Sequence, residues 1–205
     1  MKGLFLKDIY TLMKQLRSLF FVLFFLSFVM SSYMCAFLIY YAAMLPITAF
    51  AYDERSKWDE LALMMPYSIR DLVGSKYLLG LCSVLAASAF SCILLPVSAL
   101  IKGGSVYDPS GWIGILFLAL IALILMAINL PLTFLFGVEK GRIVLCILLG
   151  VGVSLGFLIK EQLLPLVSLF SHPLLPALIL LALTVVLLLL SLWVSTRIYR
   201  KKHFS

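Results

Sequence analysis

The sequence predicts an all-α membrane protein with six transmembrane helices, an amphipathic N-terminal helix in the membrane interface and a short cytoplasmic helix in the first loop. Hydrophobic residues make up 64% of the 205 residues, and the mean hydropathy is +1.16, far above that of soluble domains. The apolar residues gather in runs long enough to cross about 30 Å of hydrocarbon. Lys and Arg stand at the ends of these runs, which is the positive-inside pattern.

Composition also narrows the function classes. The length suits a single transmembrane domain over residues 1–205, and the net charge of +7 comes without a basic stripe, so we expect no nucleic-acid partner. All four cysteines lie inside apolar runs, where they resemble small buried hydrophobes rather than a disulfide framework. Neither a CxxC pair nor a Cys/His spacing occurs, so no metal site is predicted.

The first segment, residues 1–17, predicts a helix that lies in the cytoplasmic interface. The apolar residues that recur at helical spacing are Leu4, Phe5, Ile9, Leu12, Met13 and Leu16, and a polar face is expected to hold Lys2, Lys7, Asp8, Lys14 and Arg17. The basic start is also compatible with a signal peptide. No small-x-small cleavage site follows near Ser31, so we keep the segment in the mature protein.

The chain from Ser18 to Tyr52 carries no charge and is too long for one comfortable crossing. It forms either one tilted helix or a hairpin that turns near Ser31–Tyr33, with spans at about 18–32 and 34–52. The hairpin places 14 of the 16 Lys and Arg residues inside, whereas a single crossing places six inside and ten outside. The positive-inside rule therefore favours the hairpin, with both termini in the cytoplasm.

Four further spans are expected at about 73–101, 112–136, 143–160 and 174–195, separated by glycine, proline and charge signals. Trp112 and Trp193 fall near span ends, where their rings favour the interface. We expect no charged residue inside the spans, which disfavours a proton-coupled carrier. The last span ends in a basic cluster of Arg197, Arg200, Lys201 and Lys202, a strong cytoplasmic stop.

The loop at 53–72 belongs to the one long polar stretch, Asp53 to Lys76, which holds five of the nine acidic residues. A helix over Glu54–Met65 is predicted, ended by Pro66, with one face made of Trp58, Leu61, Ala62 and Met65. Ser68 and Asp71 then fit a capping box, so a second helix is expected to start there and run into the next span. An ordinary solvated loop is the alternative.

This loop resembles the first cytoplasmic loop of small bacterial permeases of type-2 ABC exporters. The likeness rests on Asp53-Glu54-x-x-x-Trp58, on Met65-Pro66-Tyr67-Ser68 and on Ser75-Lys76-Tyr77. It extends to the amphipathic N-terminal helix, the six spans and the second cytoplasmic loop, Phe136 to Arg142, and so covers nearly the whole chain. Within the family the chain is most similar to permeases that export amphipathic peptides such as phenol-soluble modulins.

The resemblance implies that the first loop forms a coupling helix that sits in a cleft of a cytoplasmic ATPase subunit, with Trp58 as the apolar anchor. By position, the contact residues are Asp53, Glu54, Arg55, Lys57, Trp58, Asp59, Glu60, Leu61 and Met65. A second cytoplasmic contact is expected at Glu139, Lys140 and Arg142. The chain has no phosphate-binding loop, because Ile69 stands where the first glycine before Gly74-Ser75-Lys76 is needed. ATP and Mg²⁺ would therefore be bound by the partner ATPase, and this chain is expected to have no cofactor and no enzymatic activity.

Several polar and small residues within the spans are candidates for a substrate path or for helix contacts. Asn129 lies two residues before Pro131, whose ring frees a backbone carbonyl that the amide could satisfy, at a kink lining the path or in simple packing. Pro46 and Pro96 also suggest kinks. Small residues recur every fourth position at Ser83, Ala87 and Ser91, and Gly152 and Gly156 form a GxxxG pair, which serves either a dimer interface or packing within the chain.

The predicted function is the permease subunit of an ATP-driven exporter of amphipathic peptides, lipid-like molecules or drugs across the bacterial plasma membrane. Its partners would be the ATPase subunits, a second permease chain, identical or paralogous, and the lipid. A non-transporting immunity or assembly protein is the alternative. An intramembrane enzyme is disfavoured, because the spans hold neither a Ser/His nor an Asp/Asp pair.

Overall fold

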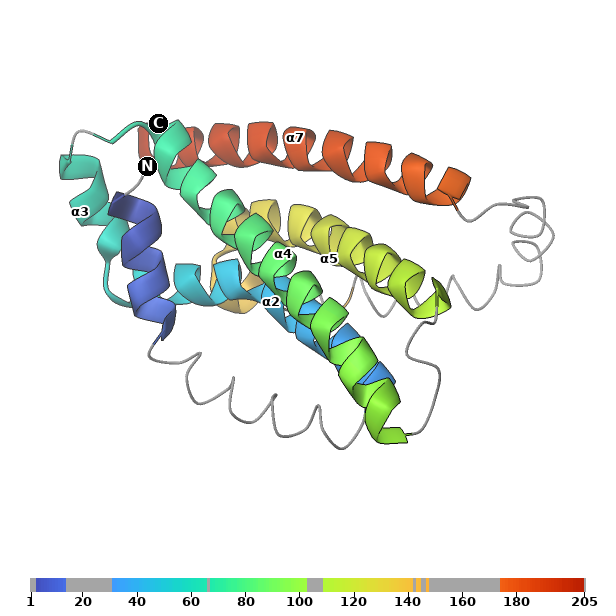
Figure 1. Cartoon of the computed structure of the whole chain (residues 1–205). Coiled ribbons are helices and arrows are strands. Elements are labelled where there is room, and N and C mark those ends of the chain that lie inside the picture. The colour runs from blue at the N-terminus through green and yellow to red at the C-terminus, as the bar shows by residue number, and fades with distance from the viewer. Residues whose placement is uncertain are drawn as a thin grey trace.

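The computed structural model describes residues 3–13, 31–65, 67–102, 109–141, 143–144, 147 and 174–204, and these contain helices and no strand. The four long helices are α2 (Ser31–Arg55), α4 (Ile69–Lys102), α5 (Pro109–Phe136) and α7 (Leu174–Phe204). They form one bundle, in which α2 packs chiefly against α4, and α5 against α7. The short helix α3 (Trp58–Met64) and the N-terminal helix, residues 3–13, lie at one end of it (Figure 1).

Three of the described helices contain stretches long and apolar enough to cross a membrane, namely Ile69–Pro96, Gly111–Phe136 and Pro176–Lys201. Their apolar side chains point mostly outward, since only 17% of the most apolar window of α7 is buried inside the protein. Outward-facing apolar surface on this scale is stable in lipid rather than in water. The predicted span 34–52 lies within α2, which is not among the three, and 18–32 and 143–160 fall almost wholly outside the described residues.

The three helices α2, α4 and α5 come close together at Gly80. A Cβ atom built on Gly80 would lie 2.3 Å from the sulfur of Met126 and 2.7 Å from Cγ of Pro46. Only a residue without a side chain allows this approach. The largest buried cluster surrounds the crossing and includes Ile39, Val73, Val84 and Leu130.

A serine on α4 donates a hydrogen bond to the backbone carbonyl that the proline in α2 leaves without a donor. Pro46 has no N–H, so the carbonyl of Ala42 loses its donor within the helix. The hydroxyl of Ser83 donates to that carbonyl at 2.8 Å. A serine of the small-residue row thus satisfies a backbone group that would be costly to leave unpaired in lipid.

The proline within α5 is matched in the same way by a serine on α7. Pro131 frees the carbonyl of Ala127, and the hydroxyl of Ser191 donates to it at 2.5 Å. Ser191 also shares a hydrogen bond with the hydroxyl of Tyr77. Ser191, and not Asn129, therefore satisfies this carbonyl.

Asn129 is 1% exposed and occupies a different position from the one its sequence neighbours suggest. Its amide nitrogen contacts the sulfur of Met44 at 3.4 Å, and its amide oxygen has no partner among the described residues. The amide thus faces α2. At about 3.6 residues per turn, two positions along a helix lie on roughly opposite sides of it, so the Asn129 side chain points away from the carbonyl of Ala127 that Pro131 frees.

The start of α4 confirms the predicted capping box. The backbone N–H of Asp71 donates to the Ser68 hydroxyl at 3.2 Å, and that hydroxyl donates to the Asp71 carboxylate at 2.8 Å. Helix α4 begins at Ile69 and continues to Lys102 without interruption. The second helix of the predicted elbow and the next span are one element.

The predicted helix over Glu54–Met65 is divided in two. Helix α2 continues through Arg55, and Lys57 then adopts a left-handed backbone conformation with φ of 51°. This conformation ends α2 and starts α3 in a new direction. Helix α3 ends at Met64 because Met65, the residue before Pro66, is extended.

Candidate functional site at the charged end of the bundle

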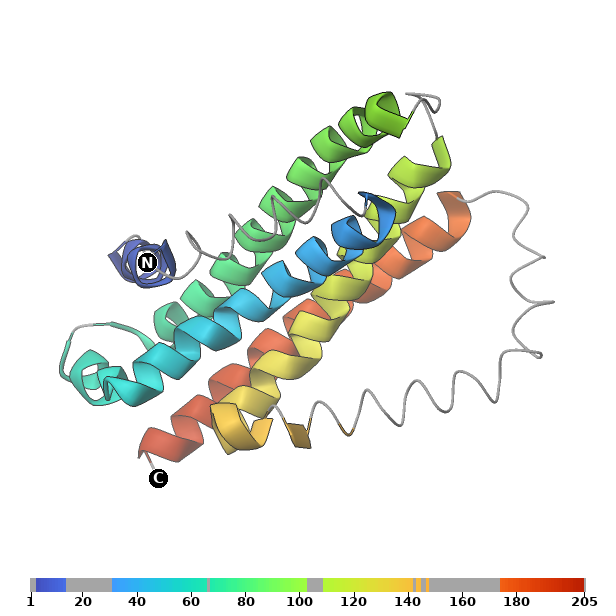
Figure 2. The same cartoon turned by 90° about the horizontal axis from the view of Figure 1, so that it is seen from below.

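The N-terminal helix, α3 and the C-terminal part of α7 lie at the same end of the bundle, as Figures 1 and 2 both show. The described part of α7 runs through Phe204, well beyond the predicted end of that span at 195. Residues from several elements meet around a cavity of about 20 Å³, and they include Leu4, Asp53, Trp58, Lys76 and Tyr199. The residues predicted to face the cytoplasm are thus gathered in one place.

Four charged side chains form a closed cluster beside this cavity, which we call the charge cluster: Lys7, Asp8, Asp53 and Lys76. The Lys76 ammonium contacts Asp8 at 2.8 Å and Asp53 at 2.5 Å. The Lys7 ammonium contacts Asp53 at 2.5 Å and Asp8 at 3.1 Å. Each cation touches both anions, so the cluster has no net charge and joins the N-terminal helix, α2 and α4.

The charge cluster is largely removed from solvent. The side chains of Asp8, Asp53 and Lys76 are 2%, 7% and 7% exposed, and that of Lys7 is 25% exposed. Removing one member of a buried ion pair leaves its partner's charge uncompensated and costs about 3–5 kcal/mol, whereas removing a neutral pair costs far less.

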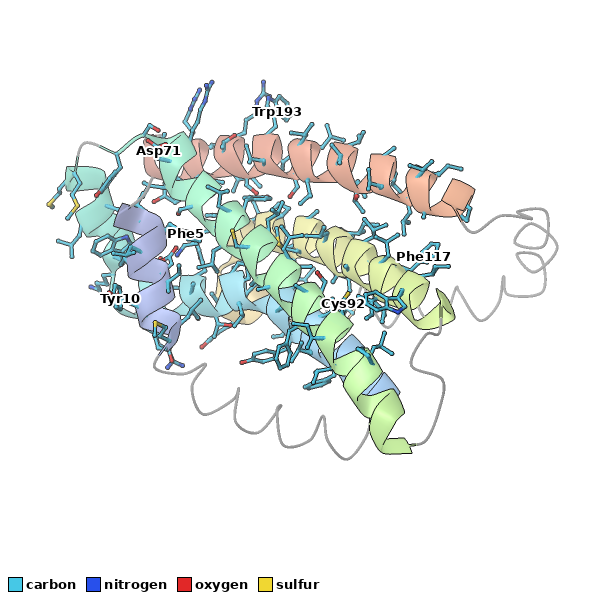
Figure 3. The ribbon with its side chains drawn as sticks, in the orientation of Figure 1. Phe5, Tyr10, Asp71, Cys92, Phe117 and Trp193 are labelled. Carbon is cyan, nitrogen blue, oxygen red and sulfur yellow. The ribbon has the colours of Figure 1, made fainter. Side chains whose placement is uncertain are left out.

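The charge cluster corrects two predictions. Asp8 does not lie on a polar face, because it is buried between Leu4 and Leu12 at four-residue spacing, and the outward stripe of the N-terminal helix consists of Leu6, Tyr10 and Met13. Figure 3 shows Tyr10 on the outer side of that helix. Lys76 lies inside the predicted span 73–101, so the spans are not free of charge; the cost of burial is met by the two aspartates.

Trp58 faces the protein rather than standing out as an anchor. The Lys7 ammonium lies 4.4 Å from the centroid of its ring, within the range of a cation–π contact. The ring also lines the small cavity next to Asp53. Trp58 and Asp53, two of the predicted ATPase contacts, are therefore engaged inside this chain.

The surface of α3 is apolar where the sequence places other contact residues. Met64 is 84% exposed and Leu61 50% exposed, and Met65 is also exposed, whereas Ala62 is fully buried. The predicted face of four apolar residues is thus split, because α3 has only seven residues and Met65 lies beyond its last turn. The side chains of Asp59 and Glu60 lie outside the described residues.

Glu54 connects the two loops at this end. Its carboxylate accepts a hydrogen bond from the backbone N–H of Val138 at 3.2 Å. Gly137, with φ of 79°, precedes it and lets the chain turn after α5. A groove of about 720 Å³ runs between these segments and is lined by Tyr52, Glu54, Arg55, Phe136, Gly137, Val138, Glu139 and Lys140, among others.

The remaining predicted site residues have the following positions. Arg55 and Lys57 are exposed at the end of α2 and in the turn after it. Arg142, Gly152 and Gly156 lie outside the described residues.

Among the described residues no three His, Cys, Asp or Glu side chains are grouped in a way that could hold a metal ion. Sequence reasoning missed Lys7 and Asp8 as site residues and used Lys76 only as part of the family motif Ser75-Lys76-Tyr77; the signal for Asp8 was a carboxylate between two leucines of the same helical stripe.

The described helices, with their outward apolar surface, are typical of a membrane protein, and a comparison with known families identifies which kind. The model of the ABC-2 family transporter proteins matches residues 3–200. The chain belongs to the ABC-2 transporter family. It is a multi-pass membrane protein and the permease of an ABC transporter, a transport subunit rather than an enzyme. No curated protein and no solved structure matches this permease.

Proposed function

We propose that this permease is the membrane subunit of an ATP-driven exporter, and that its ATPase partner docks on the exposed edge of α3. One observation carries the proposal: Leu61 and Met64 present apolar side chains to the outside at the charged end of the bundle. Apolar side chains surrounded by charged ones are the usual centre of a protein interface. The exposed charges of Glu54, Arg55 and Lys57 would form the polar rim.

The side of the membrane follows from the same end of the molecule. The N-terminal helix lies beside the end of α2 that carries Asp53, and Leu12 packs with Leu45 and Ala49. Helix α2 begins at Ser31, about 27 Å from Ala49 at 1.5 Å per residue. This arrangement supports the predicted hairpin, which places α3 in the cytoplasm with both termini, where an ATPase can reach it.

The separate ATPase is required because this sequence lacks a phosphate-binding loop, so ATP and Mg²⁺ would be bound by the partner. We infer that two permease chains, identical or paralogous, enclose the route. Mostly apolar walls, as on the outward faces of α5 and α7, suit amphipathic peptides, lipid-like molecules or drugs. Gly152 and Gly156 remain candidates for the contact between the two chains.

The proposal is tested with the double variant Leu61→Ala/Met64→Ala. Both side chains are exposed, so folding is expected to be unchanged, while affinity for the cognate ATPase is expected to fall at least about tenfold because two interface side chains are truncated. The measurement is the amount of ATPase that copurifies with the tagged permease. Tyr10→Ala is the matched control, since Tyr10 is a large side chain that is 67% exposed but lies on the N-terminal helix.

Two outcomes contradict the proposal. Equal ATPase capture by Leu61→Ala/Met64→Ala and wild type would remove α3 as the docking element. Failure of the wild-type chain to bind any ATPase encoded with it would favour the immunity or assembly alternative.

A further inference from the structure

We propose that the charge cluster is the joint that passes a displacement of α3 to α4 and to the N-terminal helix. Lys7, Asp8, Asp53 and Lys76 are then positioning residues for transport, a role that the motifs containing Asp53 and Lys76 do not by themselves indicate. The inference rests on the proposed function, because it assumes that an ATPase moves α3.

The connectivity of the cluster makes it a joint between elements. Lys7 and Asp8 come from the N-terminal helix, Asp53 from the last turns of α2, and Lys76 from the second turn of α4. Two of the four ion pairs join residues that are far apart in the chain, Lys7 to Asp53 over 46 positions and Asp8 to Lys76 over 68 positions. None of the three helices can shift at this end without changing at least two ion pairs.

Helix α3 is attached to this joint at two points. The Trp58 ring, in the first turn of α3, lies under the Lys7 ammonium. Asp53 stands one turn before the left-handed turn at Lys57, and the carbonyl of Asp53 accepts a hydrogen bond from Ser56 at 3.2 Å. A force on α3 therefore reaches both cations, through Trp58 to Lys7 and through Asp53 to Lys76.

The cluster also has room for a second arrangement. Oxygen Oδ2 of Asp8 is buried and has no hydrogen-bond partner among the described residues. The adjoining cavity of about 20 Å³ is large enough for about one water molecule or for a small movement of an ammonium group. Lys7, the most exposed member, can exchange one Asp8 oxygen for the other without leaving a charge unpaired. Two discrete pairings of this kind are what a switching element needs.

Two charge-neutral double variants test the joint. Asp53→Asn/Lys76→Gln disconnects α2 from α4, and Lys7→Gln/Asp8→Asn disconnects the N-terminal helix. Each removes one cation and one anion, so neither leaves a stranded charge. Lys7→Arg keeps the charge and is the conservative variant. Arg70→Gln is the matched control, because Arg70 is an exposed cation in the first turn of α4.

The readout is the ATP-dependent movement of α4 in the complex with the cognate ATPase, reconstituted in lipid nanodiscs. Spin labels replace Leu85 on α4 and Leu183 on α7, both exposed, in a background without native cysteines. Their separation is measured without nucleotide and after trapping with ATP and vanadate. Wild type, Lys7→Arg and Arg70→Gln are expected to show the same shift, and the two double variants roughly half of it or less while binding the ATPase normally.

Each other outcome decides against the joint. A full shift in both double variants would leave the cluster as a structural support only. Aggregation of both variants would show that the cluster serves folding rather than transmission. A wild-type complex that binds no ATPase, or that shows no shift with ATP, would overturn the proposed function and this inference with it.

Discussion

At the scale of single residues, Gly80 determines how closely α2, α4 and α5 approach one another. A methyl group at this position would collide with Met126, which can move, and with the ring of Pro46, which cannot move freely. We expect Gly80→Ala to lower the free energy of unfolding by about 1–3 kcal/mol, as overpacking does elsewhere. The measurement is unfolding of the purified protein in detergent.

Gly114 provides the matched control for that substitution. It also lies within a long helix, α5, but a Cβ atom there would meet nothing within 4 Å. Gly114→Ala is expected to leave stability unchanged or slightly raised. Equal effects of the two substitutions would show that the close crossing does not depend on Gly80.

Two pairs of elements are each joined by a proline and a serine: α2 to α4 through Pro46 and Ser83, and α5 to α7 through Pro131 and Ser191. Ser83→Ala would leave the carbonyl of Ala42 without a donor and is expected to destabilise by about 1 kcal/mol. In a Pro46→Ala background the new N–H can bond to that carbonyl, so the same Ser83→Ala substitution is expected to cost less. A double-mutant cycle measured by unfolding in detergent gives the difference.

Ser88→Ala is the control for this cycle, because the Ser88 hydroxyl donates to the carbonyl of Leu85 in its own helix and to no other group among the residues that the structure describes. Its effect is expected to be small and the same with Pro46 or with alanine at that position. A Ser83→Ala cost that does not depend on Pro46 would contradict the pairing of serine with proline.

At the scale of elements, local signals were predictable and long-range ones were not. The capping box at Ser68 needs only residues 68 and 71, and it was predicted correctly. The break at Lys57 has no glycine or proline to mark it, so the sequence could not separate α2 from α3. Which lysine meets which aspartate depends on how three helices are placed against one another, and no periodicity within one helix contains that information.

The same limit explains the position of Trp58. A tryptophan in a polar loop is typical of an interface anchor. That expectation uses only the neighbouring sequence and does not include Lys7, which lies 51 positions earlier in the chain. Because the N-terminal helix packs beside the loop, the Trp58 ring contacts the Lys7 ammonium of the same chain. The apolar edge left for a partner is the next one around α3, with Leu61 and Met64.

On the scale of the whole molecule, the N-terminal helix, α3 and the end of α7 lie together, and the opposite end of the bundle holds the end of α4 and the start of α5 and of α7 (Figure 2). Trp193 points away from the bundle (Figure 3), and the Arg197 guanidinium lies 4.1 Å from its ring centroid. An aromatic ring with a cation over it is typical of the boundary between lipid and water. The charged end and the far end are therefore expected to face opposite aqueous compartments.

Cysteine labelling in intact cells tests this orientation. In a background without native cysteines, Lys57→Cys is expected to resist a membrane-impermeant maleimide added from outside, and Ser110→Cys at the start of α5 is expected to react. Lys57 is exposed, so permeabilised cells should label it fully and serve as the control. Labelling of Lys57→Cys in intact cells would reverse the topology and remove α3 from the reach of any ATPase.

The closed charge cluster has a consequence for how this permease changes during evolution. A single substitution that removes the charge at any of its four positions leaves an unmatched charge in a buried place, so most such one-step changes would be lost by selection. Losses of charge that persist must come as pairs of opposite sign, although two of the contacting pairs, Lys7–Asp53 and Asp8–Lys76, lie 46 and 68 residues apart. Lys7, Asp8, Asp53 and Lys76 are therefore expected to vary together across related permeases, as a neutral set that is either kept whole or replaced in matched steps.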